Sequence, residues 1–285
     1  MPFFRERAAT GWEISFLVFT VALLAVPGTT WLMSTTGSSP EFEPLVSRAL
    51  IFGVPIAAIV GIKPLRFAAI NYLRQPIAPG RRVDVLWGSL LCILGNFASA
   101  GAVALLIWMQ GGQEAMISRL QIHGDQALAD SLTLASLLML PVAWLIGPAF
   151  EELVFRGFMF HAFARRLHWI VAMLVTAVMF GIYHPMFVSA FLGSILFTCV
   201  MRRTGSLRSA IVTHAVGNAA LWYPLLGRFV FPTDAGEDIG RFATWWLQLG
   251  CLAAFMIALP IYAWMARDYR MAMHIPEADS AATSV

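Results

Sequence analysis

Apolar residues run along this chain in long, nearly uncharged segments, and polar residues gather between them. A helix needs about 20 consecutive apolar residues to cross the hydrocarbon core of a bilayer. Segments of roughly this length occur at 12–33, 46–62, 84–109, 131–150, 169–184, 186–201, 209–226 and 242–266. The pattern predicts an all-α polytopic membrane protein with about eight transmembrane helices. Because 169–184 and 186–201 are short and flank Pro185, they form either two spans or one bent helix.

Charged residues sort the loops between these segments into two kinds. Arginine and lysine near the ends of membrane helices stay on the cytoplasmic side. They cluster before the first segment and after the second, fourth, sixth and eighth: Arg5, Arg7, Lys63, Arg66, Arg74, Arg81, Arg82, Arg165, Arg166, Arg202, Arg203, Arg208, Arg267 and Arg270. The alternate loops carry no comparable excess of basic residues. We therefore expect a multi-pass protein of the plasma membrane with both termini in the cytoplasm.

Composition supports this class and narrows the partners. Hydrophobic residues make up 59% of the chain and charged residues only 12%, as in polytopic membrane proteins. The net charge of +3 comes almost wholly from arginine, since Lys63 is the only lysine, and it offers no basic surface for nucleic acid. The expected surroundings are a lipid bilayer, and the arginine-rich, lysine-poor composition indicates a bacterial protein.

Several ionisable residues nevertheless lie in or beside the apolar segments, where each costs roughly 2.5–3.5 kcal/mol to insert. They are Glu151, Glu152, Arg156, His184 and His214, and Asn218 joins them as a neutral polar group. Glu152 and Arg156 are four residues apart and share a helix face, so they can form an ion pair. Glu151 is turned about 100° from Glu152 and stays outside that pair. The alternative interpretation is that this stretch is a solvated helix end, and the stretch alone does not decide between them.

An unpaired carboxylate in apolar surroundings is a good proton acceptor, which favours Glu151 as a general base. Pro148, just upstream, is expected to kink the helix there. His184 lies one turn after Phe180, and His214 and Asn218 share a face of their helix. A single histidine in a membrane helix is often only a packing residue. We also interpret Asn96 as a helix-packing residue. The polar residues of the three segments together nevertheless suggest a functional site.

The chemistry that such a set supports is hydrolysis. Glu151 would deprotonate a water, His184 would position that water, and His214 with Asn218 would donate hydrogen bonds to an oxyanion. Two histidines and a carboxylate also resemble the three protein ligands of a catalytic zinc. No H-E-x-x-H helix occurs in the chain, and the sequence leaves the presence of a metal open.

Three motifs occur in order on successive predicted helices: E-E-x-x-x-R at 151–156, F-x-x-x-H at 180–184 and H-x-x-x-N at 214–218. With these motifs the chain resembles the CPBP family, which comprises CAAX prenyl proteases of the Ras-converting type and bacterial relatives linked to bacteriocin processing and self-immunity. The resemblance covers about residues 130–225. It implies an intramembrane endopeptidase with eight helices.

The resemblance also implies roles for the site residues. Glu151 would be the general base, Glu152 and Arg156 a supporting pair, and His184, His214 and Asn218 the groups that bind water and the oxyanion. The family has been described both as glutamic proteases and as metalloproteases. We favour the glutamic type, which needs no cofactor, and keep zinc held by Glu151, His184 and His214 as the alternative.

These inferences give one expected organisation and function. Residues 1–129 are N-terminal transmembrane helices, 130–225 a CPBP-like catalytic core, 226–268 an outer loop and the last transmembrane helix, and 269–285 a polar tail. The expected partner is a peptide or protein substrate at the membrane, whose identity is open because most bacteria do not prenylate proteins. The rival functions are a non-catalytic interaction or self-immunity protein and a proton-coupled transporter.

Overall fold

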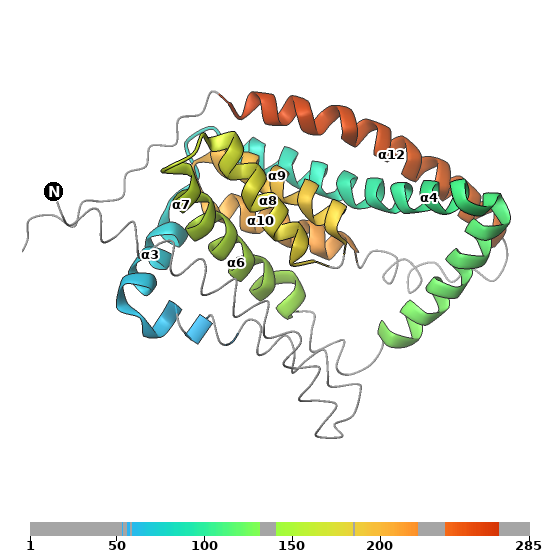
Figure 1. The fold of residues 1–285 in the computed structure, drawn as a ribbon, viewed down its shortest axis with the longest axis horizontal. Coiled ribbons are helices and arrows are strands. Elements are labelled where there is room, and N and C mark those ends of the chain that lie inside the picture. Colours follow the sequence, from blue (N-terminus) through green and yellow to red (C-terminus); the bar gives the residue numbers. More distant parts are fainter. Residues whose placement is uncertain are drawn as a thin grey trace, which may run out of the picture.

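The computed structural model describes residues 59–131, 141–184, 186–221 and 237–267, together with Gly53, Ile56 and Ala57. Every regular element in these ranges is helical, which confirms the predicted all-α class (Figure 1). The α-helices are α3 (Lys63–Arg74), α4 (Arg82–Ser131), α6 (Gly147–Glu152), α7 (His161–Ala164), α8 (Trp169–Ile182), α9 (Phe187–Thr204), α10 (Leu207–Leu221) and α12 (Glu237–Met265). Two π-helical segments, η2 (Val142–Ile146) and η3 (Leu153–Phe160), flank α6. The predicted span 12–33 lies outside the described residues, as do most of 46–62 and 131–140, so the number eight stays a prediction.

Several of these helices have the length and composition of membrane spans. Within the described ranges, Arg82–Gly112, Phe187–Thr204 and Trp246–Met265 are long and apolar enough to cross a bilayer, and Trp169–Ile182 is a shorter apolar helix. Large apolar side chains on α4 and α12 point outward, including Met109 and Ile257. A surface of this kind needs lipid rather than water around it. The chain is therefore a polytopic α-helical membrane protein.

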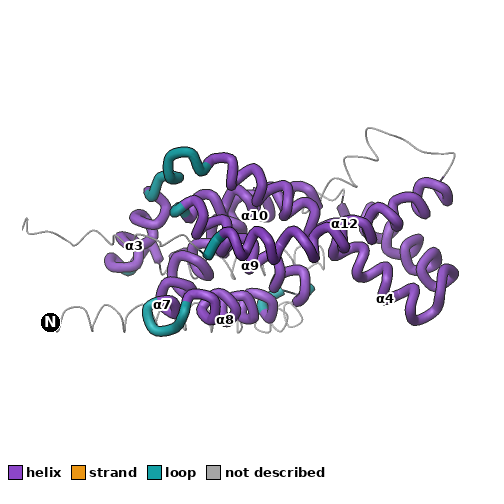
Figure 2. Tube along the Cα trace, turned by 90° about the horizontal axis from the view of Figure 1, so that it is seen from above, coloured by secondary structure: helices purple, strands orange, loops and turns teal. Residues whose placement is uncertain are grey.

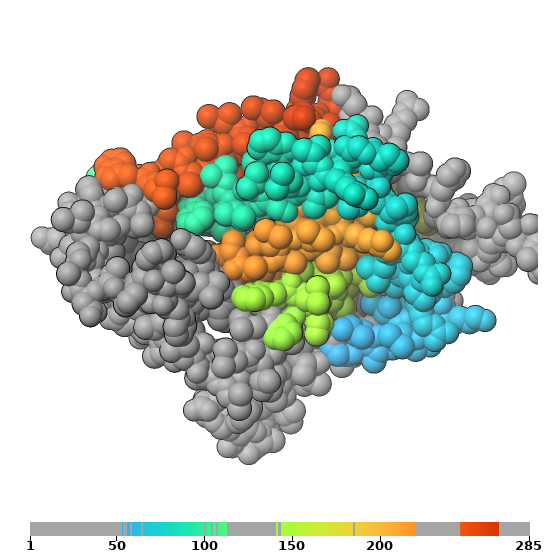
Figure 3. All heavy atoms as spheres, turned by 180° about the vertical axis from the view of Figure 1, so that it is seen from behind, coloured from blue at the N-terminus to red at the C-terminus, as the bar shows by residue number. Residues whose placement is uncertain are grey.

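The helices are layered, with α9 inside the bundle and α12 outside it. α12 and α4 run side by side along one edge of the molecule (Figure 1), and seen from behind α4 lies between α12 and α10 (Figure 3). Just over half of α9 is buried, compared with about a fifth of the apolar part of α4. The polar residues that α9 and α10 carry are consequently shielded from lipid.

Residues 169–201 form two helices rather than one bent helix. α8 ends at Ile182 and α9 begins at Phe187, on either side of Pro185. The two helices pack antiparallel, because Cys199 Sγ near the end of α9 lies 3.9 Å from Met173 Sδ near the start of α8. A short turn at 165–168, drawn in teal beside α7 and α8 in Figure 2, connects α8 to the preceding helix. The hairpin between α8 and α9 places His184 at its bend.

The segment from η2 to α7 absorbs a proline without ending. Pro148 lies in the first turn of α6, and the residue four positions before it, Trp144, is in the π-helical segment η2. The wider turns of a π-helix accommodate the missing N–H and the ring of proline, which would clash with an ordinary α-helical turn. The predicted kink is therefore realised as π-helical turns on both sides of α6. All residues of 150–160 are buried.

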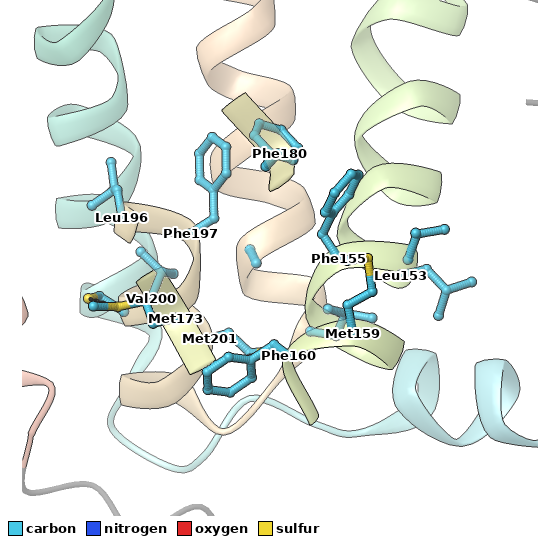
Figure 4. Packing of buried hydrophobic residues seen from close by; sticks show 14 of the residues in the cluster. Leu153, Phe155, Met159, Phe160, Met173, Phe180, Leu196, Phe197, Val200 and Met201 are labelled. Atoms are coloured by element: carbon cyan, nitrogen blue, oxygen red, sulfur yellow. Dashed lines mark hydrogen bonds between the residues drawn. The ribbon is translucent and has the colours of Figure 1, made fainter. Parts of the chain in front are cut away.

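A cluster of aromatic and aliphatic side chains holds this segment against the hairpin. In Figure 4, Phe180 of α8 lies between Phe155 of η3 and Phe197 of α9, with Met159 and Phe160 below them. The rings of Phe155 and Phe180 meet edge to face with their centroids 4.9 Å apart. Such an arrangement is favoured by the quadrupoles of the rings and fixes how the helices rotate about their axes.

Candidate active site

The first part of the site is a buried ion pair beneath the motif residues. Arg156 Nη1 donates a hydrogen bond of 3.0 Å to Glu152 Oε1, and both side chains are fully buried. This excludes the interpretation of the stretch as a solvated helix end. The Arg156 guanidinium also lies over the rings of Phe180 and Phe197, 4.5 Å and 5.3 Å from their centroids. The rings supply a cation–π contact where water is excluded.

Glu152 has a second partner that the sequence did not reveal. His214 Nδ1 lies 2.9 Å from the same oxygen, Glu152 Oε1, which joins α10 to α6. Because a carboxylate can only accept, the imidazole donates through Nδ1. Phe197 stacks on the His214 ring, with centroids 4.5 Å apart and planes inclined by 17°. His214 is thereby held from one edge and from one face, with Nε2 left to meet Glu151.

His184 is oriented in a similar way from the bend between α8 and α9. Its Nδ1 lies 2.7 Å from the carbonyl oxygen of Phe180, which can only accept, so that Nδ1 donates here too. The ring also packs on the Phe180 ring, with centroids 4.2 Å apart. The spacing of the F-x-x-x-H motif therefore has a physical meaning: phenylalanine and histidine one turn apart form one packed and hydrogen-bonded unit.

Glu151 lies beside the imidazole rings of both His184 and His214. Its Oε2 lies 3.7 Å from His184 Nε2 and 3.7 Å from His214 Nε2. These separations exceed a direct hydrogen bond, but one water between the three atoms could bond to each of them. Residues from α6, α10 and the bend after α8 are thus brought to one point, as the sequence predicted.

The three groups open into a cavity of about 270 Å³. Glu151, His184, His214 and Asn218 line it, whereas Glu152 and Arg156 lie buried behind His214. The remaining wall comes from α4, α9 and α12, whose lining residues include Asn96, Ser99, Ser189, Gly193, Phe197 and Phe255. The site is therefore concave, mostly apolar and supplied with a few convergent polar groups, as enzyme sites usually are.

The sequence missed the residues that hold the motif side chains in place. Phe197 lies under His214 although no motif marks it, and Asn96 bonds to the backbone of α10 from outside the motif region. His161, beside the motif, contacts the backbone of Arg156 through a 2.5 Å hydrogen bond from Nδ1 to the carbonyl oxygen. From the sequence, Asn96 is interpreted only as a helix-packing residue. His161 could have been suspected as a support, since it follows Arg156 closely and a π-helical segment leaves carbonyl groups available.

The donor set of Glu151, His184 and His214 has the chemistry of a catalytic zinc site: two imidazole nitrogens and one carboxylate, each imidazole supported through its other nitrogen. In the part of the chain that the structure describes, however, no three His, Cys, Asp or Glu side chains are arranged so as to hold a metal ion. Zinc held by Glu151, His184 and His214 stays the alternative to a scheme that uses these side chains and one water.

Comparison with known proteins gives one match. Residues 133–220 match the family described as Type II CAAX prenyl endopeptidase Rce1-like, and this range contains all three motifs. No curated protein and no solved structure matches the chain. The matched range begins before η2 and ends in α10, so it supplies the six motif residues but not the α4 and α12 walls of the cavity. Over residues 133–220 the chain is therefore similar, at the level of the family, to the Rce1-like, CAAX-type endopeptidases.

Proposed function

We propose that this chain hydrolyses a peptide bond of a membrane-associated protein or peptide with a water that Glu151 activates. The observation that carries the proposal is the convergence of Glu151 Oε2 with the Nε2 atoms of His184 and His214 in one cavity, at 3.7 Å each. The wall of the cavity is mostly apolar, which strengthens the electrostatic interactions inside it.

The first step is the attack of water on the scissile carbonyl carbon. Glu151 takes one proton from the water as the new C–O bond forms, and His184 Nε2 accepts a hydrogen bond from the other proton and so orients the water. The carbonyl oxygen becomes an oxyanion. The Asn218 amide donates to it, together with His214 in its protonated form, whose charge the Glu152 carboxylate stabilises through Nδ1.

The second step breaks the C–N bond. Glu151 returns its proton to the departing nitrogen, so that one water and one peptide bond become one carboxylic acid and one amine. Arg156 balances the charge of the Glu152 carboxylate beneath His214 throughout. The fully buried pair of Glu152 and Arg156 thus has a supporting role, and Glu151 carries out the proton transfers to and from water and the leaving group.

The test uses the purified protein in proteoliposomes and internally quenched peptides that end in a CAAX sequence, with and without a farnesyl group on the cysteine. We expect cleavage by the wild type and a loss of kcat by about 10²–10⁴-fold in Glu151→Gln, because general-base catalysis contributes about that much. Thermal unfolding in detergent should show that the variant is folded. Cleavage that is equal in both proteins, or absent from the wild type, would exclude the proposal.

The same preparation distinguishes the rival schemes. Glu151-dependent cleavage that survives a strong zinc chelator supports the glutamic type, whereas loss of cleavage with recovery on added zinc supports a zinc held by Glu151, His184 and His214. A self-immunity phenotype that persists unchanged in Glu151→Gln favours the non-catalytic interaction protein. Uptake into proteoliposomes driven by a proton gradient favours the transporter.

We also propose that the chain is a multi-pass protein of a bacterial plasma membrane with both termini in the cytoplasm. The arginines that follow alternate helices support this orientation, because those described lie at one end of the bundle. Arg203 donates to the carbonyl oxygen of Met265 at the end of α12, and Arg208 donates to that of Leu73 at the end of α3. Cysteine labelling from each side of intact cells would test the orientation.

A further inference from the structure

The cavity is completed by a helix outside the segment that matches the family. Asn96 lies on α4 and lines the same cavity as Glu151 and Asn218. Its Nδ2 donates a hydrogen bond of 2.7 Å to the carbonyl oxygen of Gly217 on α10. This contact is directed at the backbone of the helix that carries two of the motif residues.

The contact is possible because α4 and α10 approach closely at Gly217. A Cβ atom at this position would overlap the sulfur of Cys92, which is one helical turn before Asn96 on α4. Cys92 and Asn96 therefore straddle Gly217, the first filling the space of a missing side chain and the second binding the carbonyl group. Glycine also leaves its own backbone less restrained than any other residue, so an external anchor matters more here than elsewhere in a helix.

The anchored carbonyl belongs to the same peptide unit as the N–H of Asn218. A peptide unit is planar, so fixing the Gly217 oxygen fixes the plane that ends at the Cα of Asn218. The direction in which the Asn218 side chain leaves the helix follows from that plane. His214, three residues before Gly217, is held separately by Glu152 and Phe197.

We propose that Asn96 is a positioning residue of the active site, which acts through the peptide plane between Gly217 and Asn218 and aims the Asn218 amide at the oxyanion. The proposal rests on the proposed function, because it assigns Asn218 a hydrogen bond to the oxyanion. It adds a residue of α4 to a site whose six other residues all lie within 133–220. It predicts that Asn96 affects the chemical step rather than substrate binding.

The experiment measures kcat and KM with the farnesylated quenched peptide in proteoliposomes. We expect Asn96→Ala to lower kcat about 3–10-fold, the range for one lost hydrogen bond, with KM changed less than about twofold. Asn96→Asp keeps the size of the side chain but sets an acceptor against the Gly217 carbonyl, so its loss of kcat should be at least as large. It also serves as the second variant if Asn96→Ala does not fold.

Tyr262→Phe is the matched control. Tyr262 lies on α12, does not line the cavity, and donates a hydrogen bond of 3.1 Å to a backbone carbonyl oxygen of α4, that of Asp84. Its removal tests whether the loss of any side-chain bond to the backbone of a neighbouring helix has the same effect. We expect kcat of Tyr262→Phe to stay within about twofold of the wild type, since no bond to the peptide plane of Asn218 is lost.

A double-mutant cycle then separates positioning from a general effect on packing. If Asn96 acts through Asn218, Asn96→Ala should have no further effect on kcat in an Asn218→Ala background, measured in single turnovers with excess enzyme. Reductions that multiply would overturn the proposal, as would an unchanged kcat in Asn96→Ala while Glu151→Gln is inactive. If the wild type cleaves nothing, the proposed function itself fails and this proposal fails with it.

Discussion

Two arginine–carboxylate pairs of this molecule, one fully buried and one partly buried, are built differently. One is Glu152–Arg156 beneath the active site, and the other is Asp84–Arg203, where α4 begins and α9 ends. Arg203 donates to Asp84 Oδ1 through Nε at 2.8 Å and Nη2 at 2.5 Å, and its Nη1 donates to the carbonyl oxygen of Met265 at 3.1 Å. Tyr262 donates to the carbonyl oxygen of Asp84 at 3.1 Å. This second pair thus ties α4, α9 and α12 together at one end of the bundle.

The pair under the active site is far less satisfied. Within the described residues, Glu152 Oε2 and both Nε and Nη2 of Arg156 are buried without a hydrogen-bond partner. The single engaged oxygen, Glu152 Oε1, is shared between Arg156 and His214. Buried polar atoms without partners cost free energy, so this pair is a poor device for stability alone. We therefore interpret Asp84–Arg203, whose guanidinium nitrogens all have partners, as a structural pair, and Glu152–Arg156, whose one bonded carboxylate oxygen is shared with His214, as a support for His214.

The largest effect on the free energy of unfolding is expected when Arg156 of the pair under the active site is replaced and Glu152 is kept. Arg156→Met should lower the free energy of unfolding by about 3–5 kcal/mol, because it leaves the Glu152 carboxylate buried without a counter-charge. The double variant Glu152→Gln with Arg156→Met should recover most of this stability, since it buries no charge. Unfolding in mixed detergent micelles measures both variants.

Activity should not recover with stability in the double variant. Glutamine still accepts a hydrogen bond from His214 Nδ1 but cannot stabilise the imidazolium, so we expect kcat to stay about 10–100-fold below the wild type. A double variant that regains both stability and full kcat would show that the pair is structural only. The contrast between the two pairs would then disappear.

A smaller effect, confined to stability, is expected at the other pair. Asp84→Asn removes the charge that Arg203 and Arg81 face and should lower the free energy of unfolding by about 1.5–3 kcal/mol, the range for hydrogen bonds to charged groups. Because Asp84 does not line the cavity, kcat of the folded protein should stay unchanged. A fall in kcat comparable to that of the Glu152 and Arg156 variants would mean that this pair also sets the geometry of the site.

The sequence predicts well whatever depends on spacing within one helix. The pairing of Glu152 with Arg156 follows from their separation of four residues, and the packing of Phe180 against His184 follows in the same way. The position of an interruption near Pro185 is also a local signal, because proline disfavours a continuous helix, but the sequence left two spans and one bent helix as alternatives. These features need only the geometry of a single element.

Contacts between helices could not be predicted in the same way. The bonds from His214 to Glu152 and from Asn96 to Gly217 depend on how neighbouring helices rotate and slide, which the packing of many side chains decides together. Arg203 illustrates the limit: its position after a span indicates a cytoplasmic loop, yet its bonds to Asp84 are visible only in the structure. Asp84 itself carries no signal in the sequence.

The smallest effect on kcat is expected at Phe197, whose ring lies against both His214 and Arg156. This effect still distinguishes a contact that supports His214 from one that only fills the core. Phe197→Leu keeps an apolar side chain but removes the flat face, and aromatic contacts of this kind contribute about 0.5–1.5 kcal/mol. If that contribution orients His214 in the transition state, kcat should fall about 2–10-fold.

Phe160→Leu supplies the matched comparison for this last prediction. Phe160 is fully buried in the same cluster, but its ring contacts His161 rather than His214. Both variants should unfold at similarly reduced temperatures, because each removes a buried ring, and only Phe197→Leu should lower kcat. Equal losses of kcat in both would mean that the cluster acts by general packing. A loss at Phe197 alone would show that the support of His214 extends from the charged group at its edge to the ring on its face.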